Sequence, residues 1–381
     1  MTAGLDRREF LGGAAAAAAA GKEVRTGFIG VGSRGGSLLR ETLAQADVTV
    51  KAVCDIDPQA RDQALSLAAR HQPQSFTEWK AVVDLKDVDA VFIGAPCDLH
   101  AEMAAACLEA GKYVYCEKPL GITPQQVDQV VRAARRSKAF LQIGQQLRYF
   151  PNMQEAVERI RDPQLVGRIY IIKAQRHSSR GRPAAGAPEP TAQQKARAAW
   201  YADVKRSGDQ IVENSVHNID ICNWIAGSRP ASAYGHGKKY FPSPIPAGTV
   251  MMDGFSVEYI YENDVHLDYS GLSFHARQLR QLPNGQWYVI FGEKGSVHLT
   301  HESATFYDLY GDGQPQDLLV KSKGLKVTDT AVQEFFACIR EKRQPLADIT
   351  VAATAALTAI LGREAIYKRR SVTWKELGVA L

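Results

Sequence analysis

Residues 24–36 read Val-Arg-Thr-Gly-Phe-Ile-Gly-Val-Gly-Ser-Arg-Gly-Gly, a short β-prone run that breaks into glycines and continues as a helical pattern. Gly30, Gly32 and Gly35 have the spacing G-x-G-x-x-G between a predicted strand and a helix that begins near Ser33. In this context the first glycine makes a tight turn, the second lets the backbone approach a pyrophosphate, and the third lets the helix pack on the strand. Because the helix N-terminus points free N–H groups at the phosphates, the stretch predicts a dinucleotide-binding turn.

A carboxylate follows the next predicted strand. Val48–Cys54 is apolar and ends in Asp55, twenty residues after Gly35, where an acidic residue commonly binds the adenosine ribose. Because a carboxylate accepts hydrogen bonds from a 2′-hydroxyl and repels a 2′-phosphate, we expect NAD rather than NADP as cofactor. Arg34 is the one nearby residue whose charge would soften this preference. The alternative interpretation is an ordinary glycine turn followed by a helix-capping Asp.

Length and composition indicate a two-domain globular protein. The chain has 381 residues, of which 45% are hydrophobic and 23% charged. Its net charge of +5 comes from 46 basic and 41 acidic residues spread along the chain, which argues against a nucleic-acid partner. The six cysteines form no C-x-x-C pair and are interpreted as small core residues. No purely apolar run approaches the roughly twenty residues of a membrane span, so we expect none.

The first twenty-one residues have the pattern of an export signal. Arg7 and Arg8 lie within Asp-Arg-Arg-Glu-Phe-Leu, which is followed by two glycines and seven alanines. This resembles a twin-arginine signal, which directs folded protein out of the cytoplasm. We therefore expect a periplasmic or secreted protein. The alternative is a cytoplasmic protein with a disordered, alanine-rich N-terminus over residues 1–21.

Residues 22–145 alternate between apolar strands and helical stretches. Apolar runs of four to six residues separated by helices predict a Rossmann-type, doubly wound parallel sheet. The expected strands are Val24–Ile29, Val48–Cys54, Val88–Ile93, Tyr113–Cys116 and Phe140–Ile143. Ligands of such sheets bind at the carboxyl ends of the strands. Three predicted strand ends carry candidate site residues: the glycine turn, Gly94–His100 and Glu117-Lys118-Pro119.

The pattern changes after residue 145, and residues 146–381 predict an α+β domain. Alternating stretches such as Phe255–Tyr261, Val265–Ser270, Trp287–Phe291 and Ser296–Thr300 suggest a mostly antiparallel, open sheet. Helices are expected near 153–161, 209–226, 328–340 and 350–368, with a loop at 178–191. The whole chain is thus predicted to be an α/β protein with two domains. The family resemblance described next implies that this second domain binds substrate and forms oligomers.

Three further stretches carry a family resemblance. They are Ala110-Gly-Lys-Tyr-Val-Tyr-Cys-Glu-Lys-Pro119, Gln145-Gln-Leu-Arg-Tyr149 and Val212-Glu-Asn-Ser-Val-His-Asn-Ile-Asp220. Together with the glycine turn, they resemble the Gfo/Idh/MocA family of sugar and cyclitol oxidoreductases. The resemblance implies a nucleotide domain joined to an open-sheet domain, with substrate between them. It also implies a homo-oligomer, a dimer or tetramer, formed through the outer face of the open sheet.

Lys118 resembles the catalytic lysine of that family. A lysine beside an oxidised nicotinamide lies near a like charge in a partly dry pocket, and both effects lower its pKa. Such a lysine can exchange a proton with a sugar hydroxyl as hydride leaves the carbon. The alternative is a surface lysine that ends a strand.

His217 is the second candidate catalytic residue. In one continuous helix from Asp209, the residues Glu213, His217 and Asp220 would share a face. Because histidine titrates near the working pH, we expect His217 to give and take the proton of the reacting hydroxyl together with Lys118. The family usually has Asp where Glu213 stands, which leaves the role of Glu213 open. The alternatives are a structural histidine and, less favoured, a metal site, so we predict no metal.

The remaining candidates complete the predicted site. The predicted cofactor-binding residues are Gly30, Gly32, Ser33, Arg34, Gly35, Asp55, Pro96, His100, Glu117 and Lys118. Those predicted to bind substrate are Arg148, Tyr149, Trp200, Tyr201, Glu213 and Asp220. For Arg148 and Tyr149, a structural link between the domains is an equally good explanation. For Trp200 and Tyr201, core packing is the commoner explanation.

Three functions fit these residues. The first is an NAD-dependent oxidoreductase that acts on a hydroxyl of a sugar, glycoside or cyclitol through tightly bound cofactor. The second is a glycoside hydrolase that uses NAD in a transient oxidation followed by elimination, which the same Lys and His would serve. Export of the folded protein favours a redox cycle that closes on the enzyme in either case, because free NAD is scarce outside the cytoplasm. A non-catalytic NAD-sensing protein is the third, and Lys118 and His217 argue against it.

Overall fold

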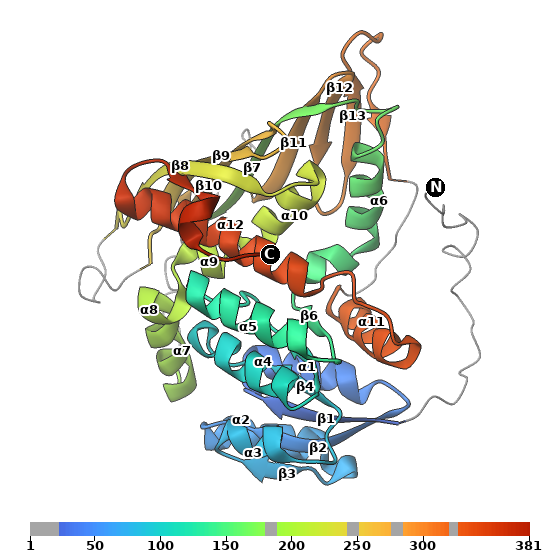
Figure 1. Ribbon diagram of the computed structural model, residues 1–381, viewed down its shortest axis with the longest axis vertical. Coiled ribbons are helices and arrows are strands. Elements are labelled where there is room, and N and C mark those ends of the chain that lie inside the picture. The colour runs from blue at the N-terminus through green and yellow to red at the C-terminus, as the bar shows by residue number, and fades with distance from the viewer. Residues whose placement is uncertain (1–22, 180–188, 242–250, 276–284, 320–326) are drawn as a thin grey trace.

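A six-stranded parallel sheet forms the first half of the computed structural model (Figure 1). The structure describes residues 23–179, 189–241, 251–275, 285–319 and 327–381. The elements of this half are β1 (Val24–Ile29), α1 (Ser33–Leu43), β2 (Val48–Cys54), α2 (Pro58–Leu67), η1 (Ala69–His71), β3 (Gln74–Phe76), α3 (Trp79–Asp84), β4 (Ala90–Ile93), η2 (Cys97–Leu99), α4 (His100–Glu109), β5 (Tyr113–Cys116), α5 (Pro124–Arg136) and β6 (Leu141–Ile143). The strand order β3-β2-β1-β4-β5-β6 is that of a doubly wound Rossmann sheet, which confirms the predicted fold class.

The second half contains a nine-stranded sheet. Its elements are η3 (Gln146–Tyr149), α6 (Pro151–Ile160), β7 (Ile169–Ser179), α7 (Ala192–Ala202), α8 (Val204–Ser207), α9 (Gln210–Glu213), α10 (Val216–Ala226), β8 (Pro230–Lys238), β9 (Gly254–Tyr261), β10 (His266–His275), β11 (Gln286–Gly292), β12 (Gly295–Leu299), β13 (Ala304–Asp308), β14 (Gln316–Asp317), α11 (Val327–Glu341), α12 (Ile349–Lys368), β15 (Val372–Thr373) and η4 (Trp374–Leu377). The strand order is β14-β13-β12-β11-β7-β10-β9-β8-β15. Every pairing except that of β7 with β10 is antiparallel, as predicted.

The sequence patterns missed some elements. Strand β3 has three residues, too few for an alternating pattern, and α7 is a polar, alanine-rich helix that begins with a capping box at Thr191. The helix expected over 209–226 is interrupted between α9 and α10. The export signal, with Arg7 and Arg8, and most of the loop at 178–191 lie outside the described residues, so these stay predictions.

Aromatic stacking builds the core of the first sheet. The ring of Phe92 on β4 stacks on Phe28 and on Tyr115, with centroid distances of 4.8 and 5.2 Å. Phe335 on α11 packs edge-on against Phe92 at 5.1 Å. The side chain of Gln142 on β6 also donates a 2.8 Å hydrogen bond to a backbone carbonyl of α11. Helix α11 therefore covers the first sheet, although the predicted boundaries put it in the second domain.

Helix α12 connects the two halves of the protein. Its Arg363 donates hydrogen bonds of 2.8 and 3.1 Å to the carbonyls of Ile122, after β5, and Gly208, before α9. One turn later, the Tyr367 hydroxyl donates to the Asp209 carboxylate at 2.6 Å. In the part of the chain that the structure describes, α12 is the one helix long and apolar enough to cross a membrane, and 72% of its most apolar segment is buried inside the protein. Such burial is typical of a core helix.

We expect Phe335→Ala to destabilise the protein by about 3 to 5 kcal/mol, because it removes a fully buried ring between α11 and the first sheet. The free energy of unfolding in urea measures this loss. Tyr310→Ala is the matched control, since Tyr310 is 88% exposed and its removal should change stability by no more than about 0.5 kcal/mol. Equal effects of the two substitutions would show that α11 is not part of this core.

Candidate active site

The glycine turn has the geometry that its three predicted roles require. Gly30 has a φ of +78°, and a Cβ there would lie 2.6 Å from the backbone nitrogen of Ala95 in the loop after β4. A Cβ on Gly35 would overlap the carbonyl oxygen of Gly30, so α1 can pack this closely only through a glycine. Beside Gly32 the space is open to 4 Å, and no side chain caps the N-terminus of α1 at Ser33. The backbone is thus accessible where a pyrophosphate would bind.

Asp55 fixes this turn from the end of β2. One carboxylate oxygen accepts a 2.8 Å hydrogen bond from the backbone N–H of Val31, inside the glycine turn. The other accepts one of 2.9 Å from the N–H of Asp57. The carboxylate therefore lies at the predicted ribose position and also stabilises the turn itself.

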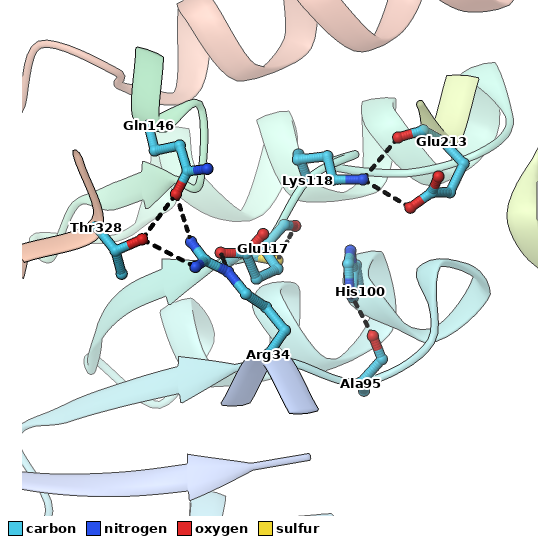
Figure 2. A network of polar contacts seen from close by, with 9 residues as sticks. Arg34, Ala95, His100, Glu117, Lys118, Gln146, Glu213 and Thr328 are labelled. Carbon is cyan, nitrogen blue, oxygen red and sulfur yellow. Dashed lines mark hydrogen bonds and ion pairs between the residues drawn. The ribbon is translucent and has the colours of Figure 1, made fainter. Parts of the chain in front are cut away.

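Arg34 is the centre of a polar network shown in Figure 2. Its guanidinium donates to Glu117 at 2.8 Å, to Gln146 at 2.9 Å and to the Thr328 hydroxyl at 3.0 Å. Gly144 makes room for this network, because a Cβ there would lie 2.7 Å from the Glu117 carboxylate. The charges of Arg34 and Glu117 thus compensate each other. The Arg34 guanidinium was expected to soften the preference against NADP, but it is already bound to these three side chains. The sequence analysis missed Gln146 and Thr328, which lie far from Arg34 in the chain.

His100 holds two loops together. Its ring nitrogens lie 2.7 Å from the carbonyl oxygens of Pro119 and Ala95, and the side chain is 1% exposed. These contacts link the loop after β4, which contains Pro96, to the segment after the cis peptide bond between Lys118 and Pro119. Because both ring nitrogens face backbone carbonyls, the structure does not support the predicted contact of His100 with cofactor. Burial lowers the pKa of the imidazole.

Lys118 forms the central ion pair of the site (Figure 2). Its Nζ donates to the Glu213 carboxylate at 2.7 Å and to the Glu213 carbonyl oxygen at 2.6 Å, and the lysine side chain is 15% exposed. Burial alone would lower the pKa of Lys118, but the Glu213 carboxylate raises it above the ordinary value. In the protein without cofactor, Glu213 thus holds Lys118 as a cation. The predicted lowering of the pKa refers to a lysine beside oxidised nicotinamide and stays a prediction.

The break between α9 and α10 creates this arrangement. In an uninterrupted helix, the carbonyl of Glu213 would accept the N–H of His217, four residues later. Here the N–H of Ser215 bonds back to the carbonyl of Gln210 at 3.1 Å, and the Glu213 carbonyl accepts Lys118 instead. The expected single helical face of Glu213, His217 and Asp220 does not exist, because Lys118 binds at the interruption.

His217 follows this break, at the start of α10. Among the described residues, no group hydrogen-bonds to its buried Nδ1 atom. Burial lowers the pKa of His217 well below the ordinary value, and the positive charges of Lys118, Arg176 and Arg34 lower it further. His217 is therefore a neutral imidazole, and the expectation that it titrates near the working pH is wrong for this state.

Tyr201 reaches the site and Trp200 does not. The Tyr201 hydroxyl accepts a hydrogen bond from the Asn214 amide and is hydrogen-bonded to the Glu213 carboxylate. Trp200 packs edge-on against Tyr201 at 5.8 Å and contacts the hydrophobic core. Both residues were predicted to stack on a sugar. Tyr201 instead contacts Glu213, the ion-pair partner of Lys118, and Trp200 packs against the core.

The remaining predicted substrate residues form structural pairs. Arg148 donates two hydrogen bonds of 2.8 and 2.9 Å to the Asp220 carboxylate, and both side chains are buried. The Tyr149 hydroxyl accepts the N–H of Ala347 at 3.0 Å and is 2% exposed. These residues bind each other or the backbone, so the predicted substrate contacts of Arg148, Tyr149 and Asp220 are not supported. Within the described ranges, no three His, Cys, Asp or Glu side chains are grouped to hold a metal.

Arg176 on β7 is a site residue that the sequence analysis missed. It lies on the same face of β7 as the buried residues Ile172 and Ala174, and its charge acts on both His217 and Glu213. Every second residue of a strand points to the same face. A charged residue that follows Ile172 and Ala174 in this alternation is the signal that could have identified Arg176.

Comparisons with known proteins agree with this geometry. Curated relatives include a glycosyl hydrolase family 109 protein of Stenotrophomonas maltophilia, 29% identical over 46% of this chain, and an inositol 2-dehydrogenase of Salmonella paratyphi B, 27% identical over 60%. The matches cover 43% and 61% of those proteins. A solved levoglucosan dehydrogenase, in complex with NADH and levoglucosan, has a TM-score of 0.76 at 19% identity, over 92% of this chain and 99% of that one, and therefore shares the fold.

Two family models match consecutive parts of the chain. Residues 24–145 match the oxidoreductase family with an NAD-binding Rossmann fold, and residues 153–298 match the GFO/IDH/MocA C-terminal domain. The first match contains the glycine turn and Lys118, and the second contains Glu213 and His217. The chain is a member of the Gfo/Idh/MocA family of oxidoreductases, with NAD as its cofactor.

Proposed function

We propose that the protein oxidises a hydroxyl-bearing carbon of a sugar or cyclitol, with Lys118 and His217 on either side of the reacting hydroxyl. The observation that carries this proposal is the 2.7 Å contact of Lys118 with Glu213, four residues before the buried, unpartnered Nδ1 of His217. The neighbour of Lys118, Glu117, accepts a 2.8 Å hydrogen bond from Arg34 at the start of α1. The names of the relatives and of the similar structure, an inositol dehydrogenase and a levoglucosan dehydrogenase, support hydroxyl compounds of this class.

The two residues have different tasks in this proposal. The Lys118 cation donates a hydrogen bond to the substrate oxygen and stabilises the negative charge that develops there. His217, which is neutral and has an unpartnered Nδ1, accepts the proton of the hydroxyl. Bound NAD supplies the acceptor for the hydride. Glu213 holds the Lys118 ammonium in position and keeps it protonated.

A glycoside hydrolase is the second candidate, favoured by the relative named a glycosyl hydrolase family 109 protein. In this reaction, oxidation of one carbon acidifies the neighbouring C–H, elimination releases the aglycone, water adds to the double bond, and the hydride returns. The two functions differ in net redox change. Release of nitrophenol from nitrophenyl glycosides without added NAD supports the hydrolase, whereas NADH accumulation with free sugars supports the oxidoreductase.

We expect Lys118→Ala and His217→Ala each to lower kcat by about a hundred- to ten-thousandfold, the usual contribution of a general acid or base. The rate of NADH formation on the best substrate of a sugar and cyclitol panel measures this. Because the two residues act on the same hydroxyl group in one transition state, the double variant should lose less than the product of the single losses.

The affinity for NADH, from fluorescence titration, should stay within a few fold in these variants. The exposed Lys138 supplies the control substitution Lys138→Ala, which should leave kcat unchanged. A His217→Ala protein that melts at lower temperature but keeps its kcat would identify a structural histidine and contradict the proposal.

Glu213→Gln should shift the pH dependence of the reaction. The carboxylate raises the pKa of Lys118, so its removal leaves burial as the dominant effect, and the pKa falls. The alkaline limb of the kcat/KM profile, where Lys118 loses its proton, should move to lower pH. Glu213→Asp retains the charge and should keep the limb nearer its original position. An unchanged limb in Glu213→Gln would show that Glu213 does not control this proton.

We also propose that the protein forms a homo-oligomer through the outer face of the second sheet. A row of residues paired across six neighbouring strands lies on this face: Ile260, His266, Ile171, Phe291, Ser296 and Tyr307. Four of them are large hydrophobic residues that are 36 to 48% exposed. An exposed, mostly apolar strip of this kind is typical of a protein interface, and a second copy would cover it with the same strip.

We expect Ile171→Glu combined with Phe291→Glu to dissociate the oligomer, because it places charges at the centre of the strip. Light scattering after size exclusion measures the mass. Leu67→Glu on α2 is the control, since Leu67 is 42% exposed but lies outside the second sheet, and should leave the mass unchanged. A wild-type protein with the mass of one chain at all concentrations contradicts the proposal.

A further inference from the structure

Arg176 lies on the inner face of the second sheet, beneath α10. On this face of β7, Ile172 and Ala174 are 0% and 3% exposed, and Arg176 is the next residue along. Its strand neighbours are Gly271 on β10, which has no side chain, and Gln286 on β11. The guanidinium therefore projects from a rigid strand into the region between the sheet and the helix that carries His217.

Arg176 has one weak partner. Its guanidinium donates a hydrogen bond of 3.4 Å to the Asn214 side chain, at the long end of the hydrogen-bond range. Across the ranges that the structure describes, no carboxylate forms an ion pair with it. A partly buried arginine is normally paired with an anion, because burial of an unpaired charge costs free energy.

The charges around His217 do not balance. Arg34 is compensated by Glu117, and Lys118 by Glu213, at 2.8 and 2.7 Å. Arg176 acts on Glu213 through space, but that carboxylate is already bonded to Lys118. His217 is neutral, so one positive charge is left over. The oxidised nicotinamide of NAD adds a second positive charge.

Unpartnered polar atoms surround this extra charge. The buried Nδ1 of His217, Oδ1 of Asn218 and Nε2 of His301 accept or donate no hydrogen bond among the described residues. The Asn218 amide donates to Gln286, the strand neighbour of Arg176, at 3.1 Å. The charge of Arg176 also acts on His301, and the exposed Glu302 acts on that ring in the opposite direction. Such a group of unsatisfied polar atoms fits a ligand with several hydroxyl groups.

We propose that Arg176 binds an acidic group of the substrate, so that the protein acts on an anionic sugar such as a uronate, an aldonate or a sugar phosphate. The planar guanidinium matches a carboxylate or phosphate with two parallel hydrogen bonds, and the charge of the acceptor makes these bonds stronger than those to the hydroxyls of a neutral sugar. This inference rests on the proposed function for the identity of the ligand as a sugar. It requires no turnover to be tested.

The test is calorimetric titration of the NADH-loaded protein with matched sugars: D-glucuronate, D-gluconate and D-glucose 6-phosphate, each against D-glucose, and D-galacturonate against D-galactose. We expect at least one acidic sugar to bind about tenfold or more tightly than its neutral counterpart. The better of the carboxylate and phosphate ligands identifies the acidic group. Arg176→Gln should remove this advantage and leave the affinities for NADH and neutral sugars unchanged, whereas Arg176→Lys should retain part of it.

Arg132→Gln is the matched control, because Arg132 is a surface arginine, 67% exposed, whose loss removes the same charge away from the site. It should preserve the preference for the acidic sugar. The inference is overturned if no acidic sugar binds more tightly than its neutral counterpart, or if the preference survives in Arg176→Gln. Absence of hydride transfer to NAD with every ligand would instead overturn the proposed function, and the paired affinities would still decide the role of Arg176.

Discussion

The contact of Lys118 with Glu213 determines how the two halves of the protein meet. The ammonium comes from the end of β5 in the first sheet, and the carboxylate comes from the break between α9 and α10 in the second half. Both groups are largely removed from water, so separation would leave uncompensated charges at a cost of several kcal/mol. Arg363 supports the pair, because it binds carbonyls of the segment that follows Lys118 and of the segment that precedes α9. The geometry of the candidate site and the domain arrangement thus depend on the same bonds.

Local patterns predicted most of the fold. The glycine turn, the parallel strands of the first sheet and the alternating strands of the second follow from residues close together in the chain, and their predicted ranges agree with the structure. Two features depend on distant residues and were not predictable in this way. Helix α11 packs on the first sheet through Phe335, which lies more than two hundred residues after Phe92 and Tyr115. The break before α10 accommodates Lys118, which is 95 residues from Glu213.

The site was predicted in part, for the same physical reason. Lys118, Glu213 and the three glycines belong to recognisable motifs, and the structure pairs Lys118 with Glu213 and gives the glycine turn its expected geometry. The pKa values of Lys118 and His217 could not be predicted from neighbouring residues. That of Lys118 depends on Glu213, and that of His217 depends on Arg34 and Arg176, which all come from other segments. Arg148 and Asp220 seemed available for substrate until each was found bonded to the other.

The position of α11 has a consequence for how the protein is made. Residues 327–341 cover Phe92 and Tyr115, so a nascent chain that has left the ribosome only as far as β6 exposes these stacked rings to solvent. Domains that fold during synthesis do so when their own residues have emerged, but this first sheet must wait for nearly the whole chain. Until then its partly assembled aromatic core is a surface on which a chaperone can bind. The aromatic core of the nucleotide-binding half can therefore reach its final packing only after residues 327–341 have emerged.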